Sequence, residues 1–157
     1  MMTLWRISKY ADLSGEGGRI GSARWHTMGR PVVYLTESPA GAMLERIVHM
    51  IDLDRNRDGN LPLTFQLLQV AIPEELAIKA LSTIAPADWK ERPEYTQQVG
   101  DGWLASTETA LARVPSAIAP RTWNYLLNPA HPDAKQVQVA EVIKERFDNQ
   151  LFRFGAR

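Results

Sequence analysis

Two arginines around an aromatic pair mark the part of the sequence with the clearest binding chemistry. Arg24 and Arg30 flank Trp25 and His26 in the glycine-bounded segment GSARWHTMGR, which leads into an extended stretch containing Tyr34. A guanidinium group is a planar fork of donors that suits bidentate binding of phosphate or carboxylate. Tyr34 offers an aromatic face to a flat ring. The plainer interpretation is a surface loop whose arginines pair with neighbouring acids, and both interpretations stay open here.

Glu45 is the first candidate for acid, base or electrostatic chemistry. It stands in a predicted helix in which Ser38 is the N-cap, Pro39 is the first helical residue and the end lies near Ile51. One apolar stripe at helical spacing comprises Leu44, Ile47, Val48 and Ile51. Glu45 lies off this stripe, on the same side as His49. Its carboxylate therefore either points into a cleft or faces solvent, as most glutamates do.

Ser116 and Asn124 are two further polar candidates. Ser116 lies between prolines in the apolar run VPSAIAP, which restricts its backbone. No sequence feature supplies a base for it, so it is either a fixed hydrogen-bonding group or a turn serine that bonds its own backbone. Asn124 lies in WNYLLNPAHP, ahead of a corner made by Asn128-Pro129. Asn124 is either a contact to a substrate or a turn residue.

Several kinds of chemistry are excluded or disfavoured by composition. The chain has no cysteine, which rules out disulfides, thiolate catalysis and iron–sulfur clusters. Its three histidines are far apart and no HExxH pattern occurs, so we expect no metal site. No P-loop or GxSxG motif is present. Eighteen basic residues balance eighteen acidic ones, which disfavours direct binding of nucleic acid by this chain.

The elements that would position these residues predict one α+β domain over residues 1–157, since strands and helices do not alternate as in βαβ units. Strands are predicted at 3–7, 31–36, 63–72 and 123–127, with a short extended segment at 114–118. Helices are predicted at 38–51 and 103–113, a loop at 14–21, and either state at 137–147. No apolar run approaches the length of a membrane span and the first residues lack a signal-peptide core, so we expect a soluble cytoplasmic protein.

Taken together, these stretches resemble the RES-domain family, the toxin half of bacterial Xre–RES type II toxin–antitoxin systems. The arginine, glutamate and serine that give the family its name match Arg24 in GSARWHTMGRPVVYLTESP, Glu45 in AGAMLER and Ser116 in VPSAIAP. The order of the motifs, the intervening Tyr34 and the later NYLLNPAHP agree with the family pattern. His26 stands where the family often has asparagine.

The resemblance implies a compact fold like that of ADP-ribosyltransferases, with a small mixed or antiparallel β core and flanking helices. It also implies an enzyme that cleaves the nicotinamide–ribose bond of NAD, as a glycohydrolase or phosphorylase, and so halts growth. NAD would be the substrate, and no other cofactor is expected. Glu45, Arg24 and Ser116 would be catalytic, and Arg24, Tyr34, Ser116 and Asn124 would bind NAD.

Other functions and partners stay open at this stage. One alternative is an ADP-ribosyltransferase that modifies a specific host protein, and another is a non-catalytic module that binds a nucleotide or a protein. The resemblance implies an Xre-like helix-turn-helix antitoxin as partner, and contact with DNA only through that antitoxin. It also allows a homodimer of this chain within the complex. Whether water, phosphate or protein accepts the ADP-ribose is not set by the sequence.

Overall fold

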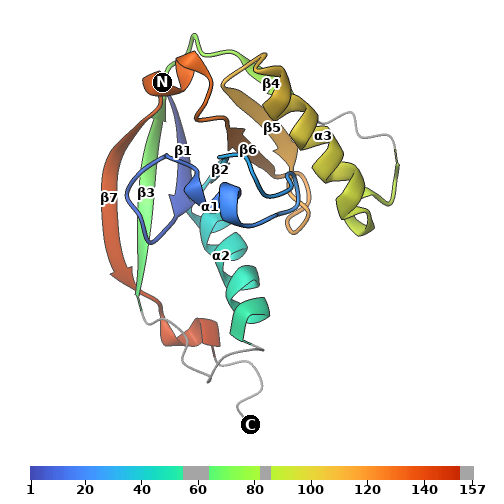
Figure 1. Cartoon of the computed structure of the whole chain (residues 1–157). Helices are drawn as coiled ribbons and strands as arrows, with labels where there is room; N and C mark the ends of the chain where they lie inside the picture. The colour runs from blue at the N-terminus through green and yellow to red at the C-terminus, as the bar shows by residue number, and fades with distance from the viewer. Residues whose placement is uncertain (55–63, 82–85, 153–157) are drawn as a thin grey trace.

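The computed structural model describes residues 1–54, 64–81 and 86–152 of the 157-residue chain. The described strands form one seven-stranded sheet in the order β4-β5-β6-β2-β1-β3-β7 (Figure 1). Neighbouring strands are antiparallel, except that β4 and β5 are parallel. The strands are β1 (Met2–Ile7), β2 (Val33–Thr36), β3 (Thr64–Ile72), β4 (Ile78–Ala80), β5 (Leu111–Pro115), β6 (Trp123–Leu127) and β7 (Gln138–Arg146). The sheet is mixed, and the predicted α+β class is confirmed.

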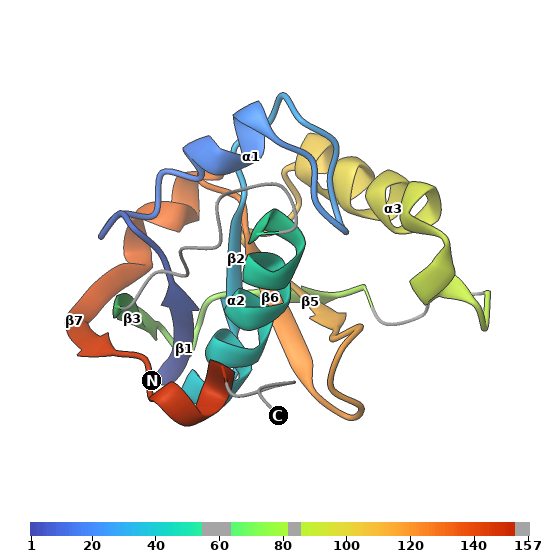
Figure 2. The same ribbon diagram turned by 90° about the horizontal axis from the view of Figure 1, so that it is seen from below.

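Three α-helices and three short 3-10 helices complete the described part of the chain. They are α1 (Glu16–Ile20), α2 (Pro39–Asp54), α3 (Pro93–Ser106), η1 (Trp89–Glu91), η2 (Pro132–Gln136) and η3 (Asn149–Phe152). Seen from below, α2 lies in front of β2 and β6, with α3 to its right (Figure 2). None of the described helices is long and apolar enough to cross a membrane.

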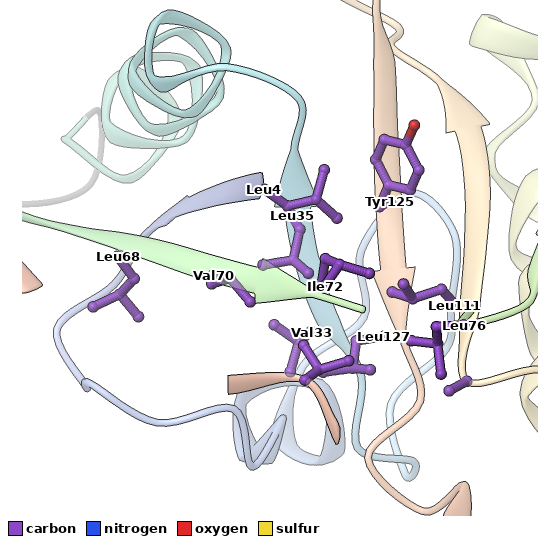
Figure 3. Close-up of a cluster of buried hydrophobic side chains, with 12 residues drawn as sticks. Leu4, Val33, Leu35, Leu68, Val70, Ile72, Leu76, Leu111, Tyr125 and Leu127 are labelled. Atoms are coloured by element: carbon purple, nitrogen blue, oxygen red, sulfur yellow. The ribbon is translucent and has the colours of Figure 1, made fainter. Parts of the chain in front are cut away.

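One face of the sheet carries the larger apolar cluster (Figure 3). Strand alternation sends every second side chain of β1, β2, β3 and β6 to this face. The buried members are Leu4, Val33, Leu35, Leu68, Val70, Ile72, Leu76, Ala110, Leu111, Tyr125, Leu127 and Val137. Removing this apolar surface from water is the main favourable contribution to folding. This cluster packs side chains from strands in both halves of the sheet against one another.

A second apolar cluster covers the opposite face of β2, β5 and β6. Its buried members are Trp25, Val32, Trp103, Leu104, Ala112, Val114 and Leu126. Tyr34 and Trp89 are partly buried against it. This packing brings α3 and the segment around Trp25 onto the face of the sheet that Tyr34 shares.

The predicted helix after Ser38 is confirmed as α2 and continues to Asp54. The N–H of Gly41 donates to Oγ of Ser38 at 2.9 Å, which is the predicted N-cap bond. The predicted apolar stripe is wrong at Leu44, which is 38% exposed. Ala42 is buried and Glu45 is half-buried, because that face of the helix turns toward the sheet instead. The side chain of Ile51 lies outside the described part.

The helix predicted at 103–113 is confirmed for residues 103–106, which belong to α3, and is wrong beyond Ser106. Helix α3 ends at Ser106, Thr107 follows in the left-handed region with φ of 51°, and Leu111–Pro115 forms β5. Strand β5 is an interior strand with apolar residues buried on both faces, including Leu111 and Ala112. A strand buried on both sides loses the alternation that identifies strands in a sequence, and this one looks like a continuation of the helix.

The other predicted elements agree with the structure, which also contains elements that the sequence analysis did not predict. Strands predicted at 3–7, 31–36, 63–72 and 123–127 correspond to β1, β2, β3 and β6, although residue 63 lies outside the described part. The ambiguous stretch 137–147 is strand β7, which pairs along β3. The predicted loop at 14–21 contains the short helix α1, and β4 was not predicted. Of the extended segment predicted at 114–118, only residues 114 and 115 belong to a strand, because β5 ends at Pro115.

Candidate active site

Three of the predicted site residues meet at one carboxylate oxygen. Nδ2 of Asn124 donates to Oε1 of Glu45 at 2.9 Å, and Oγ of Ser116 donates to the same oxygen at 3.4 Å. Glu45 comes from α2, Asn124 from β6 and Ser116 from the turn after β5. No described residue bonds Oε2 of Glu45, and that oxygen is not among the fully buried atoms without a partner. The carboxylate is therefore held through one oxygen and offers the other to a ligand.

Ser116 is oriented by its own backbone turn. Its side chain is buried, and Oγ accepts hydrogen bonds from the N–H groups of Ile118 and Ala119 at 3.2 and 3.1 Å. These two bonds occupy the lone pairs of the hydroxyl, so its proton is directed at Glu45. The interpretation as a turn serine is confirmed, and the role of Ser116 as a site residue stays a prediction. No histidine or other base contacts Oγ among the described residues.

Asn124 is a strand residue, so its interpretation as a turn residue is wrong. It pairs with Thr36 on β2 and with Val114 on β5. Two residues along the same strands, Leu126 pairs with Tyr34. Since alternate residues share a face of the sheet, Tyr34 projects from the same face as Asn124, two pairs further along. The sheet thus connects Tyr34 to the side chains around Glu45.

The Tyr34 hydroxyl is fully engaged in hydrogen bonds. It accepts from the backbone N–H of Trp25 at 3.2 Å and lies 2.7 Å from Nδ1 of His26. Nε2 of His26 lies 3.1 Å and 2.9 Å from the carbonyl oxygens of Gly18 and Gly21. Carbonyls only accept, so Nε2 carries the proton of the imidazole and Tyr34 donates to Nδ1. Burial raises the pKa of Tyr34 well above its usual range, so the ring stays neutral.

Arg24 approaches from the side of Tyr34. Its Nη1 donates to the carbonyl oxygen of Lys90 at 3.0 Å, and its guanidinium carbon lies 5.9 Å from the centre of the Trp89 ring. The positive charge of Arg24 acts to lower the pKa of Tyr34, against the larger effect of burial. No ion pair joins Arg24 to Glu45 among the described residues. The structure therefore brings Glu45, Ser116 and Asn124 into contact, and holds Arg24 against Lys90 and Trp89.

The contacts that hold Arg24 could not have been found from the sequence. Thr96 donates to the carbonyl oxygen of Arg24 from α3, and Lys90 accepts from its side chain, 72 and 66 residues away in the chain. No local pattern indicates either contact. The sequence indicates the role of His26 only in part, because the aromatic pair Trp25-His26 between two glycines suggests a packed segment.

The cavities found in the described residues lie elsewhere. One of about 640 Å³ is lined by Thr27, Arg30 and Asp101, among others, and one of about 540 Å³ by residues at the other end of the sheet. Neither is lined by Arg24, Glu45 or Ser116. The candidate site is thus defined here by its hydrogen bonds. No group of three metal-binding side chains occurs among the residues searched.

Comparison with known proteins identifies the family. The model of the RES domain matches residues 3–150, nearly the whole chain. The chain belongs to the RES-domain family. The motif residues Arg24, Glu45 and Ser116 all lie within the match, on the elements described above.

Individual relatives agree with this assignment. A Toxin Res of Pseudomonas putida is 46% identical over 153 residues, covering 96% of this chain and 100% of that protein. A protein of Sphingobium named Prs ADP-ribosylating toxin is 37% identical over 162 residues, covering 96% and 97%. These relatives, both named as toxins, are similar to this chain over nearly their whole length.

The fold has a solved counterpart. The crystal structure of the Mycobacterium tuberculosis MbcT–MbcA toxin–antitoxin complex contains a chain that superposes with a TM-score of 0.72 at 19% identity. The match covers 92% of this chain and 84% of that chain. At this identity the similarity concerns the fold, and it supports the predicted α+β architecture.

Proposed function

We propose that this RES-domain protein is a toxin that splits NAD between nicotinamide and ribose, and that the loss of NAD halts growth. The observation that carries the proposal is the carboxylate of Glu45, held through one oxygen by Asn124 and Ser116 with its other oxygen unbonded. A carboxylate fixed in this way is suited to stabilising positive charge as it develops on a bound substrate.

The chemistry of NAD cleavage matches what this site offers. Nicotinamide departs from a positively charged pyridinium and takes the electrons of the C1′–N bond, so it leaves as a neutral molecule without a general acid. The ribose carbon gains oxocarbenium character, as in glycoside cleavage. Oε2 of Glu45 would stabilise that charge. An acceptor oxygen then bonds to C1′ and releases its proton.

The remaining site residues would bind the rest of NAD. Arg24 uses one N–H on Lys90, which leaves other donors of its guanidinium for the diphosphate. The hydroxyl of Tyr34 is engaged by Trp25 and His26, so the ring would contribute its face to the nicotinamide. Ser116 would hold Glu45 with its proton, since its lone pairs accept from Ile118 and Ala119. Asn124 would hold Glu45 through Nδ2 and bond the ribose or the carboxamide with the rest of its amide. NAD is the substrate in this scheme, and no other cofactor is required.

A second candidate function differs in the acceptor. The 37% identical relative from Sphingobium is named as a toxin that ADP-ribosylates Prs, which favours transfer to a protein instead of to water or phosphate. Cleavage of the same C1′–N bond comes first in both functions. The two functions are distinguished by whether labelled ADP-ribose becomes attached to a protein.

The proposed partner is an antitoxin. The similar fold from M. tuberculosis was solved in a toxin–antitoxin complex, which supports a partner of this kind. We propose an Xre-like helix-turn-helix protein that covers the site and contacts DNA, so that this chain meets DNA only through it. Rescue of growth when a neighbouring gene is co-expressed tests this part of the proposal.

Release of nicotinamide by the purified protein tests the reaction. We expect the wild-type chain to release nicotinamide from NAD and Glu45→Gln to release it at least 100-fold more slowly, because the amide keeps the size but loses the charge, which is worth about 3 kcal/mol or more in such sites. Glu141→Gln, an exposed position on β7, is the matched control and should keep the wild-type rate. Wild-type activity in Glu45→Gln would refute the assignment. A wild-type chain that binds NAD without releasing nicotinamide would favour the non-catalytic module.

A further inference from the structure

A concave site lies at the end of the sheet where β7 ends, opposite the end next to η2. The cavity of about 540 Å³ is formed where β1 ends, β3 begins and β7 ends, with one residue from α2. The side chains most relevant to binding are those of Lys9, Arg46, Lys144, Arg146, Phe65 and Gln66. Neither the resemblance of the motifs nor the proposed reaction uses any of them.

The cavity carries a surplus of positive charge. Four of its lining residues are cationic and only one, Glu145, is anionic. None of these five side chains forms an ion pair with any other described residue. The chain as a whole has no net charge, so this accumulation is local. Like charges brought together without counter-ions repel, and a bound anion relieves that repulsion.

Strand pairing places the cations at fixed positions. Lys144 is paired with Gln66 and Arg146 with Thr64 along β3 and β7. Alternation puts Lys144 and Arg146 on one face of β7, about 6.7 Å apart along the strand. The hydrogen bonding between β1 and β3 continues one residue beyond the end of β1, since the N–H of Ser8 donates to the carbonyl of Gln66 at 3.1 Å.

The base of the cavity is equally well fixed. The side chain of Gln66 donates from Nε2 to the carbonyl of Ser8 at 3.2 Å, which fixes the backbone next to Lys9. The ring of Phe65 packs at a tilt of 47° against Phe147, with the ring centres 4.7 Å apart. These contacts fix the start of β3, where it lines the cavity.

We propose that this cavity binds a small polyphosphate anion, such as a triphosphate group. Its volume falls in the range of about 300–1,000 Å³ that small-ligand sites occupy. Four cations spread around it are too many for a single carboxylate but match a chain of phosphate oxygens, which both lysine and arginine bind well. A nucleic acid would be met by a long basic stripe, whereas these residues are gathered in one hollow of an otherwise neutral chain.

The polyphosphate site is separate from the site around Glu45 and goes beyond the proposed function. Arg46 follows Glu45 in α2, and consecutive helical residues point about 100° apart. Glu45 accordingly bonds Asn124 and Ser116, while Arg46 lines the cavity with Lys144 and Gln66. Binding at this cavity can be measured whether or not the chain consumes NAD.

Calorimetric titration of the full chain with sodium triphosphate at low salt tests the proposal. We expect one-to-one binding that weakens as salt is raised. Lys144→Gln and Arg146→Gln, both exposed, should each bind about tenfold more weakly, because each removes one charge-assisted contact. Lys135→Gln is the matched control, since this exposed lysine lies on η2, beyond the other end of the nine-residue strand β7. It should bind as the wild-type chain does.

A further variant and a second probe decide between binding sites. Arg24→Gln tests the alternative site, because the proposed function gives Arg24 the diphosphate of NAD and β7 lies at the opposite edge of the sheet from β5 and β6. Loss of binding in Arg24→Gln with no loss in Lys144→Gln would place the anion at the other site and overturn the proposal. Absence of binding would overturn it too. A duplex oligonucleotide that binds through Lys144 more tightly than triphosphate would overturn the choice of a small anion.

Discussion

Gly100 of α3 lies so close to the backbone of Trp25 that a β-carbon at position 100 would overlap the carbonyl oxygen of Trp25. One turn earlier on the same helix, Thr96 donates to the carbonyl of Arg24, and Gln97 donates to the carbonyl of Ala23 at 3.0 Å. Helix α3 therefore supports three consecutive residues of the segment that carries Arg24. The position of the guanidinium depends on a glycine that is distant in sequence.

Substitution of this glycine should displace the Arg24 segment. We expect Gly100→Ala to lower the free energy of unfolding by about 2–4 kcal/mol, because backbone on both sides of the contact must move. Gly102→Ala is the matched control: it is exposed in the same helix with nothing near its β-carbon, and it should raise stability by about 0.5–1 kcal/mol. Urea unfolding measures both. Equal effects of the two variants would show that the close approach is unimportant.

His26 is predicted to be a structural support of Tyr34. His26→Ala removes the acceptor of the Tyr34 proton and the donor to the carbonyls of Gly18 and Gly21, all in a buried position. We expect a loss of about 2–4 kcal/mol in the free energy of unfolding, since buried polar groups are left without partners. His49→Ala, exposed on α2, should change stability by less than about 0.5 kcal/mol. If the free energies of unfolding of the two variants differed by less than about 0.5 kcal/mol, the hydrogen-bond network would be contradicted.

The raised pKa of Tyr34 makes stability depend on pH at the alkaline end. The folded state keeps the phenol proton above pH 10, the ordinary pKa, whereas the unfolded state releases it. The unfolded state then binds fewer protons, so the free energy of unfolding falls as the pH rises through 10. Tyr34→Phe lacks this titration. It should be less stable than the wild type at neutral pH, by about 1–2 kcal/mol for two lost hydrogen bonds, and the gap should narrow above pH 10. A gap that widens would refute the burial of this hydroxyl.

Much of the fold follows from local patterns in the sequence. Alternating or β-branched runs identify β1, β2, β3 and β6, and the Ser38 cap with Pro39 identifies the start of α2. These signals depend on neighbours in the chain, so a single sequence contains them. The errors have a common physical cause: β5 is buried on both faces and Leu44 points away from the core, and both facts depend on packing against distant elements.

The candidate site shows the same limit. Glu45, Ser116 and Asn124 were each predicted as polar residues with an alternative interpretation, and only the pairing of β6 with β2 and β5 shows that they meet. Arg24 was predicted as a ligand-binding arginine, but its contacts with Trp89 and Lys90 come from a segment that the sequence does not associate with it. The type of chemistry can be predicted from the residues, whereas their relative placement requires the fold.

Changing Asn124 to a carboxylate provides a direct test of the charge at Glu45. Asn124→Asp replaces the donor 2.9 Å from Oε1 of Glu45 by a second acid of similar shape. Two carboxyl groups at this separation cannot both ionise readily, so one keeps its proton to a higher pH. If the reaction needs ionised Glu45, the acid limb of kcat/KM for NAD cleavage should move upward by about one pH unit or more. Asn149→Asp adds the same charge at an exposed position of η3 and should leave the limb in place. An unchanged limb in Asn124→Asp, in a variant that still cleaves NAD, would mean that the charge of Glu45 is not what the reaction uses.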